Sequence, residues 1–155
     1  MNRRALLASL ATGGTVSTAG CLGGLTATRN ESFQLGYVAV HNSTETTHRV
    51  VIRVMRDGTN VHRSTHEVAG QDGPVVDSAI PKCDWGSTPG RYEVAVRIDE
   101  RDWVTESFQG YDTAGGDCSV AIAEGTLREG GRFGLGSRRA CDYSNPPDDL
   151  CPFDR

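Results

Sequence analysis

The 155-residue chain has no apolar run long enough to cross a membrane as a helix, and only 6% of its residues are aromatic. Its longest apolar stretch, residues 5–19, is interrupted by Gly13 and Gly14, whereas a spanning helix needs about 20 apolar residues. No helical period follows residue 21, which excludes a helical bundle and a coiled coil. The net charge of −4 excludes a generally basic nucleic-acid binder. The length is that of one domain, which excludes a large multidomain enzyme.

Lysine is almost absent from the sequence. Lys82 is the single lysine among 16 basic residues, and aspartate outnumbers glutamate. Acidic surfaces with little lysine stay soluble where salt screens charge, so this bias suggests a salt-adapted protein.

The first twenty residues have the features of an export signal. Arg3 and Arg4 precede the apolar stretch, as in twin-arginine signal peptides. Small residues before Cys21 resemble a prokaryotic lipobox, which implies cleavage before Cys21 and a diacylglycerol thioether on its sulfur. A plain cleaved signal and an uncleaved amphipathic anchor are the alternatives.

The leader as a whole, from Arg3-Arg4 to Cys21-Leu22-Gly23-Gly24, resembles those of small haloarchaeal lipoproteins exported by the twin-arginine route. The resemblance implies a lipid-anchored protein on the outer face of the cytoplasmic membrane. Residues 21–32 would then be a disordered tether. The resemblance implies no activity, because that family consists largely of proteins without an assigned one.

Period-two runs of apolar residues follow one another from residue 33 onward. The expected strands are 33–40, 48–56, 61–68, 75–80, 92–98, 103–108 and 118–123, the last with an extension over 126–128. About seven short strands predict an all-β, immunoglobulin-like antiparallel β-sandwich over residues 33–128. Asp57-Gly58 predicts a hairpin turn, and Pro74 and Pro81 predict an edge position for the strand between them. Residues 89–96 resemble the G-x-Y-x-V-x-V strand of immunoglobulin-like domains.

Four cysteines remain once Cys21 is assigned to lipid, and an even number in an exported chain predicts two disulfides. Of the three pairings, we favour Cys83–Cys118 and Cys141–Cys151. The second pair would staple the C-terminal tail, residues 129–155, whose Gly- and Arg-rich first part we interpret as a flexible segment. Zinc is the competing hypothesis, and the absence of C-x-x-C spacing disfavours it.

No pattern in the chain points to catalysis or to a cofactor, so we expect a protein that is not an enzyme. There is no G-x-S-x-G nucleophile motif. His48, His62 and His66 raise the question of a metal site. Strand residues four apart lie about 13 Å from each other, so His62 and His66 are not expected to share one ion.

Two kinds of surface feature remain. Loops on a rigid sandwich commonly carry the contacts, which favours residues 82–89 and 109–117. Trp85 in the first loop is either an exposed binding anchor or a lid over the Cys83 disulfide. Asn30 and Asn42 each begin an N-x-S/T sequon in a segment expected to be exposed, so both are candidate N-glycosylation acceptors, and chance occurrence of the sequons is the alternative.

The predicted function is therefore a non-catalytic, lipid-anchored β-sandwich of the cell surface, acting as a binding or structural module of unknown ligand. Its expected partners are the membrane, through the lipid, and a cell-surface protein, but not nucleic acid. One alternative is an accessory or inhibitory domain for an exported enzyme or transporter. The other is a metal-binding or redox surface protein.

Overall fold

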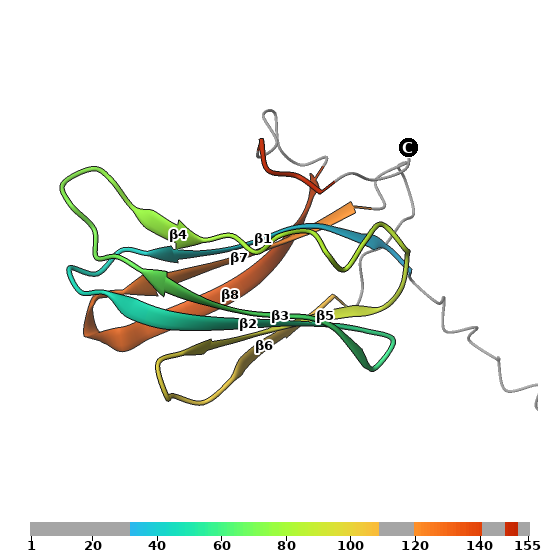
Figure 1. The fold of residues 1–155 in the computed structure, drawn as a ribbon, viewed down its shortest axis with the longest axis horizontal. Helices are drawn as coiled ribbons and strands as arrows, with labels where there is room; N and C mark the ends of the chain where they lie inside the picture. The colour runs from blue at the N-terminus through green and yellow to red at the C-terminus, as the bar shows by residue number, and fades with distance from the viewer. Residues whose placement is uncertain (1–31, 109–119, 141–147, 152–155) are drawn as a thin grey trace, which may run out of the picture.

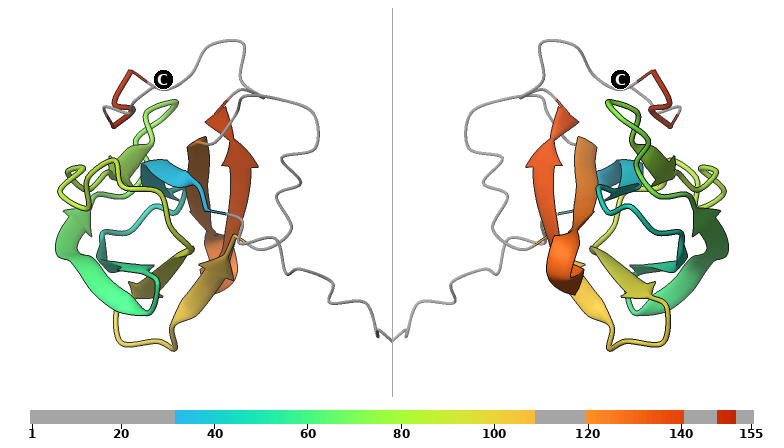
Figure 2. Two further views of the ribbon diagram at one scale, coloured as in Figure 1. Left: turned by 90° about the vertical axis from the view of Figure 1, so that its right-hand side faces the viewer. Right: turned by 90° about the vertical axis from the view of Figure 1, so that its left-hand side faces the viewer.

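The computed structural model describes residues 32–108, 120–140 and 148–151, which form two facing β-sheets (Figures 1 and 2). The strands are β1 (Gln34–Asn42), β2 (His48–Arg56), β3 (Thr59–Val68), β4 (Asp77–Ala79), β5 (Tyr92–Ile98), β6 (Val104–Ser107), β7 (Val120–Arg128) and β8 (Arg132–Arg139). One sheet has the order β4-β1-β7-β8 and the other β3-β2-β5-β6. The predicted all-β sandwich is confirmed, with eight strands in place of about seven. Within these residues, no helix is long and apolar enough to span a membrane.

One strand pair departs from the antiparallel pattern. β1 runs parallel to β7, from Gln34 opposite Val120 to Asn42 opposite Leu127, with a register shift between Leu35 and Tyr37. All the other strand pairs are antiparallel. Because β1 also pairs with β4, the first strand lies inside its sheet, held on both sides by segments distant in sequence.

The core lies between the sheets and follows the alternation of side chains. Val50, Ile52 and Val54 of β2 are at most 1% exposed, lie beside the inner residues of β5 in the same sheet and belong to one core cluster with the inner residues of β1. Burial of each such side chain stabilises the fold by about 1.5–3 kcal/mol. The intervening residues of β2, Arg53 among them, therefore lie on the outer face of the sheet.

The predicted hairpin turn at Asp57-Gly58 and the predicted edge strand between Pro74 and Pro81 are confirmed. Asp57 and Gly58 have φ values of 51° and 80° and form the turn between β2 and β3. Glycine and aspartate are favoured there because both central residues of such a turn need positive φ. β4 lies at the edge of its sheet, as its flanking prolines predict.

The segment after residue 129 differs from the prediction. Residues 132–139 form β8, antiparallel to β7, so the sandwich does not end at residue 128 and this segment is not a linker. Gly130 and Gly131, with φ of 75° and 73°, make the turn before it. Phe133 and Leu135 pack against the core. The glycines of this segment therefore form a β-hairpin with β7, where a flexible segment was predicted.

A disulfide joins Cys83 to Cys151, whose Cα atoms lie 5.4 Å apart. Both predicted pairings, Cys83–Cys118 and Cys141–Cys151, are therefore wrong. The backbone N–H of Cys151 donates to the carbonyl oxygen of Gly36 at 2.7 Å, which holds Cys151 on β1, next to the Cys83 loop. Cys118 and Cys141 themselves lie outside the described residues.

Candidate functional site

The loop of residues 82–89, one of the two predicted contact surfaces, is fastened to the sandwich through Trp85. This side chain is 3% exposed, and its Nε1–H donates to the carbonyl oxygen of Leu35 at 2.7 Å. It belongs to the same core cluster as Cys151. Trp85 is thus a core residue: of the two alternatives, the exposed anchor is wrong, and packing beside the Cys83 disulfide agrees with the structure. The other predicted contact loop, residues 109–117, lies outside the described residues.

Asn42 is buried, so its side chain is inaccessible in the folded protein. Its Nδ2 group donates to the backbone carbonyls of Thr46, Val68 and Ala69 at 2.8, 3.1 and 2.8 Å. That nitrogen is the atom a glycan would modify. The predicted glycosylation of Asn42 is therefore wrong for the folded chain, and Asn30 lies outside the described residues.

Four polar side chains form a continuous hydrogen-bonded row beside β3. Nδ1 of His62 contacts the Asp84 carboxylate, and its Nε2 lies 2.8 Å from the Ser64 hydroxyl. Nε2 of His66 lies 2.9 Å from the same hydroxyl oxygen. Since Asp84 accepts from Nδ1–H of His62, a neutral His62 accepts the Ser64 proton and His66 donates to Ser64. This assignment gives every donor in the row an acceptor.

The surroundings of the row are partly apolar. The His62 ring meets the Trp85 ring edge-on, with centroids 5.3 Å apart. Burial lowers the pKa of His66, and the neighbouring His62 lowers it further. Both effects favour neutral imidazole at His66.

The row bears on the prediction that His62 and His66 do not share one metal ion. Their backbones are far apart, but both rings lean toward Ser64, so their Nε2 atoms are less than about 6 Å apart. His48 is not part of this row, because its Nδ1 bonds to Asp99 at 2.8 Å. In the described part of the chain, no group of three or more His, Cys, Asp or Glu side chains is placed to hold a metal ion.

A second cluster occupies the outer face of the β3-β2-β5-β6 sheet. The guanidinium carbons of Arg53, Arg97 and Arg63 lie 4.8, 5.0 and 5.9 Å from the ring centroid of Trp103. Arg53 and Arg63 are direct cross-strand partners. We refer to these four residues as the arginine–tryptophan face.

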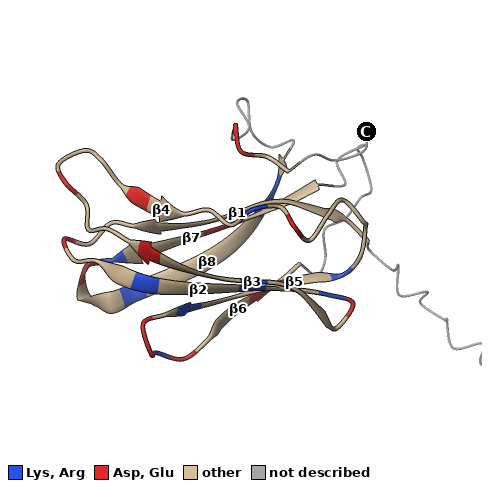
Figure 3. Ribbon diagram, viewed as in Figure 1, with Lys and Arg blue, Asp and Glu red and all other residues tan. Residues whose placement is uncertain are grey.

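The charges of this face are not balanced locally. Across residues 32–108, 120–140 and 148–151, no carboxylate forms an ion pair with Arg53, Arg63 or Arg97. The Nε atoms of Arg53 and Arg97 are buried without a hydrogen-bond partner. Many of the acidic residues instead lie in the turns that join the strands (Figure 3). The face is therefore a local concentration of positive charge on an acidic protein.

The alternation in β2 and β5 already places Arg53 and Arg97 on outward-facing positions. Only the strand order β3-β2-β5-β6 brings them beside Arg63 and under Trp103. That order depends on contacts distant in sequence, which the alternation of single strands does not reveal.

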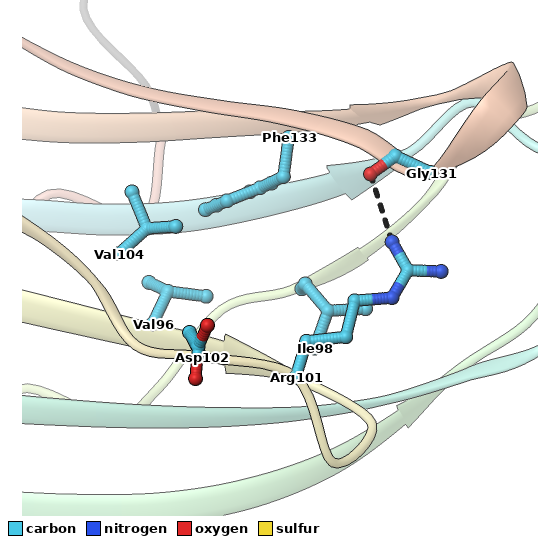
Figure 4. Close-up of a pocket in the computed structure, with 7 residues that line it drawn as sticks. All are labelled: Val96, Ile98, Arg101, Asp102, Val104, Gly131 and Phe133. Atoms are coloured by element: carbon cyan, nitrogen blue, oxygen red, sulfur yellow. Dashed lines mark hydrogen bonds between the residues drawn. The ribbon is translucent and has the colours of Figure 1, made fainter.

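A pocket of about 260 Å³ opens between the two sheets, close to the β5–β6 and β7–β8 turns (Figure 4). It is lined by Val96, Ile98, Arg101, Asp102, Val104, Gly131 and Phe133. Arg101 donates from Nη1 to the carbonyl oxygen of Gly131 at 2.8 Å, which joins one sheet to the other. The pocket is smaller than the roughly 300–1,000 Å³ of most ligand sites. We therefore interpret the Arg101 hydrogen bond as a structural link between the two sheets.

The fold and its outer face define a β-sandwich with a candidate anion-binding surface. No protein-family model, no curated protein and no solved structure matches this chain.

Proposed function

We propose that the protein is a lipid-anchored, non-catalytic β-sandwich of the cell surface that binds an acidic partner through its arginine–tryptophan face. Arg3, Arg4 and the small residues before Cys21 support export and lipid attachment. The tether of residues 21–32 would join the lipid to β1. The observation that carries the binding role is the cluster of three arginines without a carboxylate partner among the described residues.

The chemistry of this face favours a partner with several carboxylates. Three guanidinium groups within about 6 Å of one ring repel one another, and a bound anion relieves that repulsion. Guanidinium groups match carboxylates in a two-point geometry through their N–H donors. An acidic segment of another surface protein fits this description.

The net charge of −4 opposes non-specific attraction of a polyanion. Binding should therefore depend on contacts at the face itself. It should also weaken as salt rises, since part of the face is exposed.

Titration of the purified protein with polyglutamate, followed by Trp103 fluorescence and by calorimetry, tests the proposal. The double variant Arg53→Gln/Arg97→Gln should weaken binding at least about tenfold, which corresponds to the roughly 1.5–3 kcal/mol of a charge-assisted hydrogen bond. Arg132→Gln removes an exposed arginine from β8 and is the matched control. Equal binding by the wild type and the double variant would contradict the proposal. Preference for a sulfated polysaccharide over polyglutamate would instead assign the face to a glycan.

A further inference from the structure

We propose that His62 and His66 form a binding site for one divalent transition-metal ion, with copper(II) bound most strongly. This site is independent of the arginine–tryptophan face. It uses the side chains of β3 that point toward the other sheet, whereas Arg63 points outward.

The convergence of two imidazole nitrogens on one point is the first argument. Nε2 of His62 and Nε2 of His66 lie 2.8 and 2.9 Å from the Ser64 hydroxyl oxygen. A metal ion needs nitrogen ligands at about 2.0–2.1 Å. Small rotations of the two rings toward each other would place both nitrogens at that distance from an ion beside Ser64.

The proton arrangement at His62 is the second argument. Asp84 accepts the hydrogen bond from Nδ1–H, which leaves the Nε2 lone pair of His62 directed at the site. A carboxylate that holds one ring nitrogen while the other binds metal is the usual arrangement around metal-ligating histidines. Asp84 would therefore act as a positioning residue.

His66 can also present a lone pair. No hydrogen bond to its Nδ1 is found in the described part of the chain, so its ring proton can move from Nε2 to Nδ1, and the metal ion then replaces Ser64 as the partner of Nε2. The Ser64 hydroxyl, freed from both rings, then becomes an oxygen ligand or binds a coordinated water.

The donor set determines which metal is favoured. Two imidazoles with hydroxyl or water oxygens suit copper, nickel and zinc, and affinity along this series is highest for copper(II). Cys83, whose loop also carries Asp84, is bound to Cys151 and supplies no thiolate. Ser64 and His66 are partly exposed on an edge strand, which gives the ion a path to the site.

Calorimetric titration of chelator-treated protein with copper(II) tests the site, with nickel(II) and zinc(II) as weaker-binding comparisons. The wild type should bind one copper ion whose electron paramagnetic resonance spectrum shows nitrogen ligands. His66→Gln should lower the affinity at least tenfold. Asp84→Asn should lower it by about 10- to 100-fold, as is typical when such a carboxylate is removed.

His41→Gln removes a partly exposed imidazole from β1 and is the matched control, which should bind copper as the wild type does. Circular dichroism of each variant establishes that it is folded. Copper binding that is the same in the wild type and in folded His66→Gln would overturn the proposal. An equal loss of affinity in His41→Gln would overturn it as well.

Discussion

The indole Nε1–H of Trp85 donates a hydrogen bond to the backbone carbonyl of Leu35, 2.7 Å away in the interior of the sandwich. The contact joins a loop residue to β1 across fifty positions of sequence. Together with the Cys83–Cys151 disulfide, it makes the loop before β5 part of the core.

Replacing Trp85 by Phe should reduce the free energy of unfolding by about 1–3 kcal/mol, because the buried Leu35 carbonyl loses its donor. Trp85→Ala should cost about 3–5 kcal/mol, since it also leaves a cavity. Urea denaturation followed by circular dichroism measures both. Trp103→Phe, on the outer face, is the control and should cost less than about 1 kcal/mol. Equal losses for Trp85→Phe and Trp103→Phe would contradict the burial of Trp85.

Asn42→Asp keeps the size of the side chain but replaces the Nδ2 hydrogen-bond donor by an acceptor oxygen. Three backbone carbonyls would face a carboxylate oxygen in place of the Nδ2 donor. We expect a loss of about 3 kcal/mol or more, because the three carbonyls lose their donor and face a buried negative charge, for which the two hydrogen bonds from Thr44 to Oδ1 do not compensate. Thermal unfolding compares it with Asn60→Asp, an exposed site on β3 that should change stability by under about 0.5 kcal/mol. Similar melting temperatures for the two variants would disprove this role of Asn42.

Asp99 couples the β5–β6 turn to the start of β2. Its carboxylate lies 2.8 Å from Nδ1 of His48 and accepts the backbone N–H of Arg49 at 3.0 Å. Partial burial raises the pKa of Asp99, but these hydrogen bonds and the positive charges of His48 and Arg101 outweigh it, so the net pKa lies below its ordinary value. The stabilisation is therefore present above the unfolded-state pKa and is lost as pH falls through the folded-state pKa.

Asp99→Asn should lose about 1 kcal/mol or less at pH 7, because the carboxylate is 41% exposed and solvent screens its interactions. Asparagine tolerates the φ of 53° at this position, so backbone strain does not enter. Denaturation at several pH values should show the difference from the wild type shrinking as the pH falls below the ordinary pKa of aspartate and through the lower folded-state pKa of Asp99. A difference that stays constant with pH would mean that the carboxylate charge is not involved.

Cys118 and Cys141 are the two cysteines left over after the Cys83–Cys151 disulfide and the proposed lipid attachment at Cys21. They come just before β7 and just after β8, and these strands pair at that end through Ala121 and Arg139. We predict that Cys118 and Cys141 form the second disulfide. Peptide mapping without reduction should find only the pairs 83–151 and 118–141, and a peptide joining 83 to 118 would contradict both assignments.

Strands with an uninterrupted apolar face were predictable from sequence. The predicted strand 48–56 has the bounds of β2, and 92–98 has those of β5, because large apolar residues recur at every second position there. β8 was missed because Gly134 and Gly136 occupy its outward positions. Without polar side chains there, the period-two pattern of Phe133 and Leu135 resembles a linker.

The disulfide and the two candidate sites depend on three-dimensional contacts that the spacing of residues along the sequence does not determine. Cys83 meets Cys151 because the backbone of Cys151 is bonded to Gly36 of β1. The rise of a strand fixes the distance between the backbones of His62 and His66, but not the lean of their rings toward Ser64.

Lipid anchoring at Cys21 is most directly tested by the intact mass of the protein extracted from membranes of cells that produce the full chain. The mass should correspond to a chain that begins at Cys21 and carries a diacylglycerol group, and reduction should add the hydrogens of two disulfides. A chain that retains Met1, or one without lipid, would contradict the proposed anchored surface module.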